Sequence, residues 1–166
     1  MERRSGAAMS RYVRTSGGLQ DFRVAQSLVL DSRHLVNVSV RWQFAPPAKK
    51  VCVLPVIGAP EGTRIEMEVG EFKLSEPKVK FIHPDGWIRR LCVNSNHDEI
   101  RGTHKHHIVN GDLESAYEPN DIPSLPLSRH VRTGVHREIL EAFLGECNIG
   151  LGPNYRWAEP YPNQEK

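Results

Sequence analysis

Alternating apolar and polar residues are the feature that most constrains the fold of this chain. Between positions 36 and 43 every second residue is apolar, as Val36, Val38, Val40 and Trp42 alternate with Asn37, Ser39, Arg41 and Gln43. A period of two places successive side chains on opposite faces of a β-strand, so one face is buried and the other is solvated. The same period recurs at Ile65, Met67 and Val69. We therefore expect the chain to be built mainly on strands.

Turn signals divide this pattern into short segments. His83-Pro84-Asp85-Gly86 and Asn110-Gly111 carry proline and glycine where tight turns need them. Such turns favour antiparallel neighbours, because two strands joined by a hairpin run in opposite directions. Strands are expected over residues 22–30, 35–44, 51–57, 64–69, 79–82, 87–93 and 103–109.

One helix is predicted near the C-terminus, from Thr133 or Gly134 to Gly145. Its apolar residues follow the three-four spacing of a single helix face, and they are Val135, Ile139, Leu140, Phe143 and Leu144. The predicted fold is a single α+β domain in which this helix covers a strongly bent, mainly antiparallel sheet. The expected organisation is a flexible basic arm (1–20), the domain (21–149) and a Pro/Gly-rich tail (150–166).

Composition limits the class of protein. The chain has 166 residues, enough for one domain to bury a core without disulfides. Cys52, Cys92 and Cys147 are odd in number and widely spaced, so we expect all three to be reduced and largely buried. No apolar run approaches the roughly 18 to 20 residues that span a bilayer, so no membrane association and a cytoplasmic location are expected.

The charge distribution bears on partners. The net charge is +2, but residues 1–20 carry +3, so residues 21–166 come to −1. A protein that binds nucleic acid broadly needs many cations to neutralise phosphates. Any nucleic-acid partner is therefore expected to contact the arm and a local cluster of cations.

The residues that can carry chemistry concentrate between positions 89 and 107. Four of the eight histidines and four cationic side chains fall within this stretch. On a strand, His104 and His106 project to one face, whereas Lys105 and His107 project to the other. The imidazoles of His104 and His106 therefore converge, and they are the predicted centre of a site.

One interpretation of this pair is acid–base cleavage of RNA without a cofactor. Imidazole titrates at about pH 6.5, so one histidine can act as general base and the other as general acid, while arginine stabilises the phosphate. The predicted catalytic residues are His104, His106, His97, Arg90 and Arg101. The predicted substrate-binding residues are Lys105, Asn94, Thr103 and Tyr117.

Two alternatives to RNA cleavage stay open. His97, His104 and His106 can instead be ligands of a divalent transition metal such as Zn²⁺. A third possibility is a non-catalytic adaptor, in which aromatic residues of the tail such as Trp157 recognise a protein partner.

A family resemblance rests on short motifs between residues 80 and 149. The motifs are Arg89-Arg90, Asn94, His97, Gly102-Thr103-His104-Lys105-His106, Tyr117-Glu118-Pro119, Asp121-Ile122-Pro123 and Cys147-Asn148-Ile149. This series resembles small uncharacterised bacterial proteins regarded as toxin-like. The resemblance implies an endoribonuclease of a toxin–antitoxin or defence system, with RNA as substrate and an antitoxin protein as partner.

Overall fold

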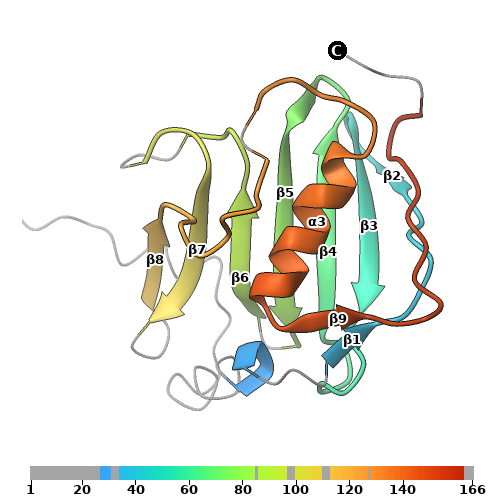
Figure 1. The fold of residues 1–166 in the computed structure, drawn as a ribbon, viewed down its shortest axis with the longest axis vertical. Helices are drawn as coiled ribbons and strands as arrows, with labels where there is room; N and C mark the ends of the chain where they lie inside the picture. The colour runs from blue at the N-terminus through green and yellow to red at the C-terminus, as the bar shows by residue number, and fades with distance from the viewer. Residues whose placement is uncertain are drawn as a thin grey trace, which may run out of the picture.

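A seven-stranded sheet forms the main layer of the protein (Figure 1). The computed structural model describes residues 27–30, 34–84, 86–96, 100–109, 113–126 and 128–162. In spatial order the strands are β2 (Gln43–Ala45), β3 (Lys49–Pro55), β4 (Arg64–Gly70), β5 (Lys73–His83), β6 (Gly86–Cys92), β7 (His104–Val109) and β8 (Leu113–Tyr117). Every neighbouring pair is antiparallel and consecutive in sequence, so the sheet is a meander.

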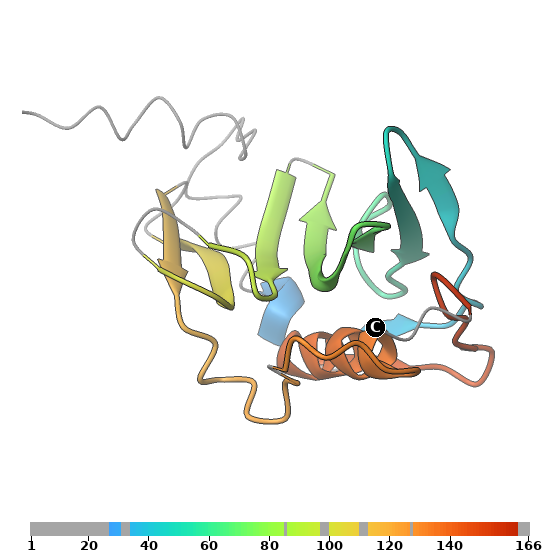
Figure 2. The same cartoon turned by 90° about the horizontal axis from the view of Figure 1, so that it is seen from above.

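Helix α3 (Val135–Glu146) covers one face of this sheet. Figure 2 shows α3 beneath the bent sheet, and among the described elements none lies over the opposite face of β5 and β6. The helix buries the predicted apolar residues together with His136. The predicted α+β fold with one C-terminal helix over a mainly antiparallel sheet is confirmed.

The strand register sorts side chains onto two faces. The face toward α3, the helix face, carries the apolar core, including Ile65, Met67, Val79, Phe81 and Leu91, each with no exposed surface. The face away from α3, the distal face, carries polar residues from β4 to β7, namely Arg64, Glu66, Glu68, Lys78, Lys80, Arg90, Cys92, His104 and His106. The period-two pattern therefore places the apolar core and the histidine pair on opposite faces of the sheet.

Two predicted segments differ from the structure. Residues 27–30 form a helical turn, so the predicted strand over 22–30 is wrong there, and residues 22–26 lie outside the described part of the chain. The predicted strand over 35–44 is divided, because β1 (His34–Val36) pairs in parallel with β9 (Ile149–Leu151) whereas β2 pairs with β3. The chain changes sheets between Val36 and Gln43, and a hydropathy pattern does not report which partner a strand takes.

The segment after α3 is held against the domain. Trp42 donates its indole hydrogen to the carbonyl of Ala158 (2.7 Å), and the ring of Trp157 packs edge-on against Trp42 at 5.9 Å between centroids. The hydroxyl of Tyr161 donates to the carbonyl of Val69 (3.1 Å). Trp157, the aromatic residue on which the adaptor interpretation relies, is thus engaged within the chain.

The cysteines match the prediction, since Cys52, Cys92 and Cys147 are all free thiols and all buried. Within the described residues, no helix has the length and apolarity needed to cross a membrane.

His136 joins α3 to β5 and makes stability depend on pH. Its Nε2 donates to the carbonyl of Leu74 (2.7 Å), and burial lowers the pKa of His136 below the usual 6.5 despite this hydrogen bond. Because the unfolded chain then binds a proton that the folded protein excludes, stability falls as the pH decreases below about 6.5, by at most about 1.4 kcal/mol per pH unit.

We expect urea unfolding to show this loss between pH 7.5 and 5.5, and the His136→Gln variant to show a smaller loss, because His107, whose pKa burial also lowers, contributes as well. His130→Gln, a change at an exposed histidine, is the control and should keep the wild-type dependence. An unchanged pH dependence in His136→Gln would contradict the assignment.

Candidate metal centre

The structure brings the predicted histidine pair together on the distal face. His104 and His106 project from β7 toward the same side, with ring centroids 4.9 Å apart and planes inclined at 70°. Both side chains are almost fully buried, at 2% and 1% exposed surface. The convergence follows from strand alternation, whereas their burial could not be derived from the sequence.

Cys92 completes a cluster of three possible metal donors. It lies on β6 opposite His104 in the antiparallel register. One donor atom from each of Cys92, His104 and His106 lies within 4.8 Å of the other two. Sequence analysis missed Cys92 as a site residue, because its position opposite His104 depends on how the loop between β6 and β7 sets the register.

A main-chain contact fixes which tautomer neutral His104 adopts. Nδ1 of His104 lies 2.9 Å from the carbonyl oxygen of Gly102. A carbonyl oxygen only accepts hydrogen bonds, so Nδ1 carries a proton, and in the neutral ring Nε2 then has the free lone pair. Gly102 has a φ of +83°, a left-handed conformation that glycine adopts without strain. A carbonyl that orients a histidine in this way is the usual outer partner of a metal-binding imidazole.

Arg90 contacts the second histidine. Its Nη2 donates to Nε2 of His106 (3.1 Å), which leaves the ring proton of neutral His106 on Nδ1. The guanidinium also lies over the ring of Trp87, 5.2 Å from the centroid. The predicted catalytic residues Arg90, His104 and His106 are therefore neighbours.

The electrostatic environment of Cys92 has two opposing components. Burial raises the pKa of the Cys92 thiol, while the cations Arg90, Lys78 and Lys80 act to lower it. The net direction is upward, so the thiol is protonated at neutral pH. A metal ion binds the thiolate, and binding would release this proton.

Lys105 lies on the helix face, as alternation predicts, and is fully buried. Its ammonium pairs with Asp121 (2.8 Å) and with Glu146 at the end of α3 (2.5 Å), and the hydroxyl of Tyr117 also donates to Asp121 (2.8 Å). Burial acts to lower the pKa of Lys105, but the hydrogen bonds to Asp121, Glu146 and Tyr117 outweigh it and raise the pKa. Lys105 and Tyr117 thus join β7 and β8 to α3, away from the histidine pair.

The aromatic rings of Tyr117 and His107, next to this network, are also shielded from solvent. Burial raises the pKa of Tyr117 to about 12, and burial lowers the pKa of His107, whose ring lies 4.5 Å from that of Tyr117. These groups keep their neutral forms at neutral pH.

Asn94 and Thr103 connect the ends of the loop between β6 and β7. The hydroxyl of Thr103 accepts a hydrogen bond from the backbone N–H of Asn94 (3.0 Å), and the Asn94 amide donates to the carbonyl of Ser75 (2.9 Å). Both residues border a cavity of about 480 Å³, together with the irregular segment from Glu118 to Leu125. The contacts of Asn94 and Thr103 therefore hold the loop between β6 and β7 in place beside this cavity.

Two predicted residues remain, Arg101 and His97. Arg101 is exposed on the loop that leads into β7. His97 lies outside the described residues, so its predicted role as a third catalytic residue or metal ligand stays a prediction.

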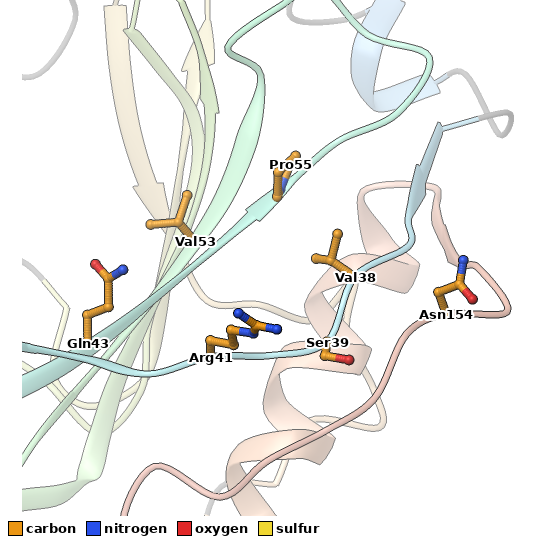
Figure 3. A pocket seen from close by; sticks show the side chains of 7 residues that line it. All are labelled: Val38, Ser39, Arg41, Gln43, Val53, Pro55 and Asn154. Carbon is orange, nitrogen blue, oxygen red and sulfur yellow. The ribbon is translucent and has the colours of Figure 1, made fainter.

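A second cavity, of about 490 Å³, lies at the other end of the sheet (Figure 3). It is lined by Val38, Ser39, Arg41, Gln43, Val53, Pro55 and Asn154. None of the predicted site residues lines it, so this cavity is separate from the histidine pair.

Comparisons of the chain with protein-family models, with curated proteins and with solved structures find no match.

The contacts of Lys105 predict a structural effect on mutation. Replacing Lys105 by Met leaves the carboxylate of Glu146, with 13% of its side chain exposed, without its partner. Removing one member of a buried ion pair lowers the free energy of unfolding by about 3 kcal/mol. We expect a loss of this size in urea unfolding of Lys105→Met.

The control is Arg132→Met, because Arg132 and Glu138 pair on the surface with about half of each side chain exposed, and it should leave stability unchanged. A Lys105→Met variant that is as stable as the control would contradict the structural role and would favour the substrate-binding role predicted from the sequence.

Proposed function

We propose that the protein binds a transition-metal ion, Zn²⁺ above all, through Cys92, His104 and His106. The observation that carries the proposal is the approach of three donor atoms, from two adjacent strands, to within 4.8 Å of one another. All three residues are buried, so the donors are shielded from solvent.

The chemistry of the donors favours zinc. One thiolate and two imidazoles are the ligand types that Zn²⁺ takes in proteins, at about 2.3 Å for sulfur and about 2.0 to 2.1 Å for nitrogen. Donors around a tetrahedral ion at these distances are about 3.4 to 3.6 Å apart. The cluster therefore needs to contract by roughly 1 Å, which rotation of buried side chains can supply.

Three protein ligands are the number typical of catalytic rather than structural zinc sites. A bound Zn²⁺ would supply Lewis acidity and a water of lowered pKa in the remaining position. The chain's own residues would orient the ligands, since the carbonyl of Gly102 fixes His104.

Arg90 competes with the ion for His106. Nε2 of His106 accepts a hydrogen bond from Arg90. Coordination through Nε2 displaces this donor, and coordination through Nδ1 places a proton on Nε2, which then opposes the donor. Either mode ends the contact between Arg90 and His106, so metal binding includes a movement of the Arg90 side chain.

Metal titration tests the site directly. We expect the chelator-treated protein to bind one Zn²⁺, and Co²⁺ to give the absorption of a thiolate-ligated tetrahedral ion. Cys92→Ala, His104→Ala and His106→Ala should each lose affinity by at least about 100-fold, because each removes a ligand.

Cys52→Ala is the matched control, since Cys52 is also a free, buried cysteine, with a pKa raised to about 12, and lies on β3, which β4 and β5 separate from β6. It should bind Zn²⁺ like the wild type. Equal affinity in Cys92→Ala and Cys52→Ala, or no thiolate absorption with Co²⁺, would rule the site out.

A second candidate is the RNA cleavage that the sequence predicts. The contact between Arg90 and His106 supports it, because a guanidinium beside an imidazole suits a phosphate. The near-complete burial of both histidines weighs against it, since RNA must reach the general base. The toxin–antitoxin setting, the antitoxin partner and the cytoplasmic location likewise remain predictions from the sequence.

Chelation separates the two candidates. If the histidines cleave RNA by acid–base chemistry, the protein cuts a labelled RNA at the same rate in excess chelator, and His104→Ala/His106→Ala abolishes cutting. The burial of the pair leads us to expect no cutting in chelator. Cutting by the chelator-treated wild type but not by the double variant would establish the second candidate instead.

A further inference from the structure

A surplus of positive charge lies on the distal face beside the metal centre. The ammonium groups of Lys49, Lys80 and Lys78 surround the single carboxylate of Glu68, at 3.2, 3.6 and 3.9 Å. These three lysines are 30–42% exposed, whereas Glu68 is 20% exposed. Three cations thus share one shielded anion, and the excess charge faces solvent.

The positive charge continues onto β6. Lys80 on β5 lies opposite Arg90 on β6, which in turn lies opposite His106 on β7. Arg64 and Glu66 on the same face pair with each other at 2.8 Å. Lys73 and Glu76 of β5 pair with each other at 3.5 Å. Apart from that pair, the described side chains of this face along β3 to β6 include five cations and two carboxylates, a local charge of +3 that exceeds the +2 of the entire chain.

The extent of the surface indicates the size of its ligand. Neighbouring strands are about 4.8 Å apart, so the cations from β3 to β6 span about 14 Å. One phosphate needs only one or two of these cations, whereas a chain of phosphates can contact them all. Trp87, the aromatic residue that the described register places on this face, is 7% exposed, so it offers little surface for base stacking.

We propose that the distal face of β3 to β6 binds the phosphate backbone of single-stranded nucleic acid. The backbone of a single strand can follow the surface of the sheet (Figure 2) and bring successive phosphates to cations on neighbouring strands. Binding depends on charge and not on base identity, because phosphate contacts carry no sequence information. This proposal does not depend on the metal site.

The test uses the full-length chain, treated with chelator, and fluorescence anisotropy of labelled single-stranded RNA and DNA over a range of salt concentrations. We expect binding that weakens steeply with salt. In Lys78→Glu/Lys80→Glu, affinity at low salt should fall at least tenfold, and the slope of log affinity against log salt should decrease by about 1.4, since each lost contact on a single strand removes about 0.7.

The matched control is Arg132→Glu/Arg137→Glu, which changes the net charge equally at exposed residues at and just before α3. It should bind as the wild type does. Lys78→Gln/Lys80→Gln, a milder change beside Glu68, should show the same direction of effect if the charge-reversed protein does not fold.

Equal losses in the two charge-reversed proteins would overturn the proposal, because binding would then reflect overall charge or the N-terminal arm, which both variants retain. Absence of binding at low salt, or binding to anionic vesicles without binding to oligonucleotides, would also overturn it. Because the protein is treated with chelator, failure of the zinc site leaves this result interpretable.

Discussion

The pairing of β6 with β7 is the constraint on which the site depends. This register sets Cys92 opposite His104 and Arg90 opposite His106. A slip of one residue would move every side chain of β7 to the other face. The histidines would then enter the apolar core, and Lys105 would leave its carboxylate partners. The same register therefore supports both the donor cluster and the ion network.

Lys105 opposes such a slip. Its buried ammonium meets Glu146 of α3 and Asp121 of the segment after β8, so a single side chain connects three parts of the fold. Burying an ion pair adds little stability relative to apolar packing, but leaving its charges unpaired is costly. The network consequently favours the one register in which Lys105 faces the helix and His104 and His106 face away from it.

Local patterns predicted what depends on local geometry. Alternation placed His104 and His106 on one face and Lys105 on the other, and helical spacing placed α3 within two residues of its observed ends. Features that depend on which strands pair could not be predicted from the sequence. Cys92 joins the site across an irregular loop, and β9 forms only because β1 offers it a parallel partner.

Arg90 is common to both proposals and links them. Its guanidinium donates to His106, and on the distal face it lies opposite Lys80 and extends the positive surface. If Zn²⁺ binds His106 as we propose, it would displace the guanidinium and leave it able to meet a phosphate. Linkage is reciprocal, so a nucleic acid that holds Arg90 away from His106 must strengthen metal binding by the same factor. The buried donors and the exposed cations would then act as one site with two ligands, joined through a single arginine.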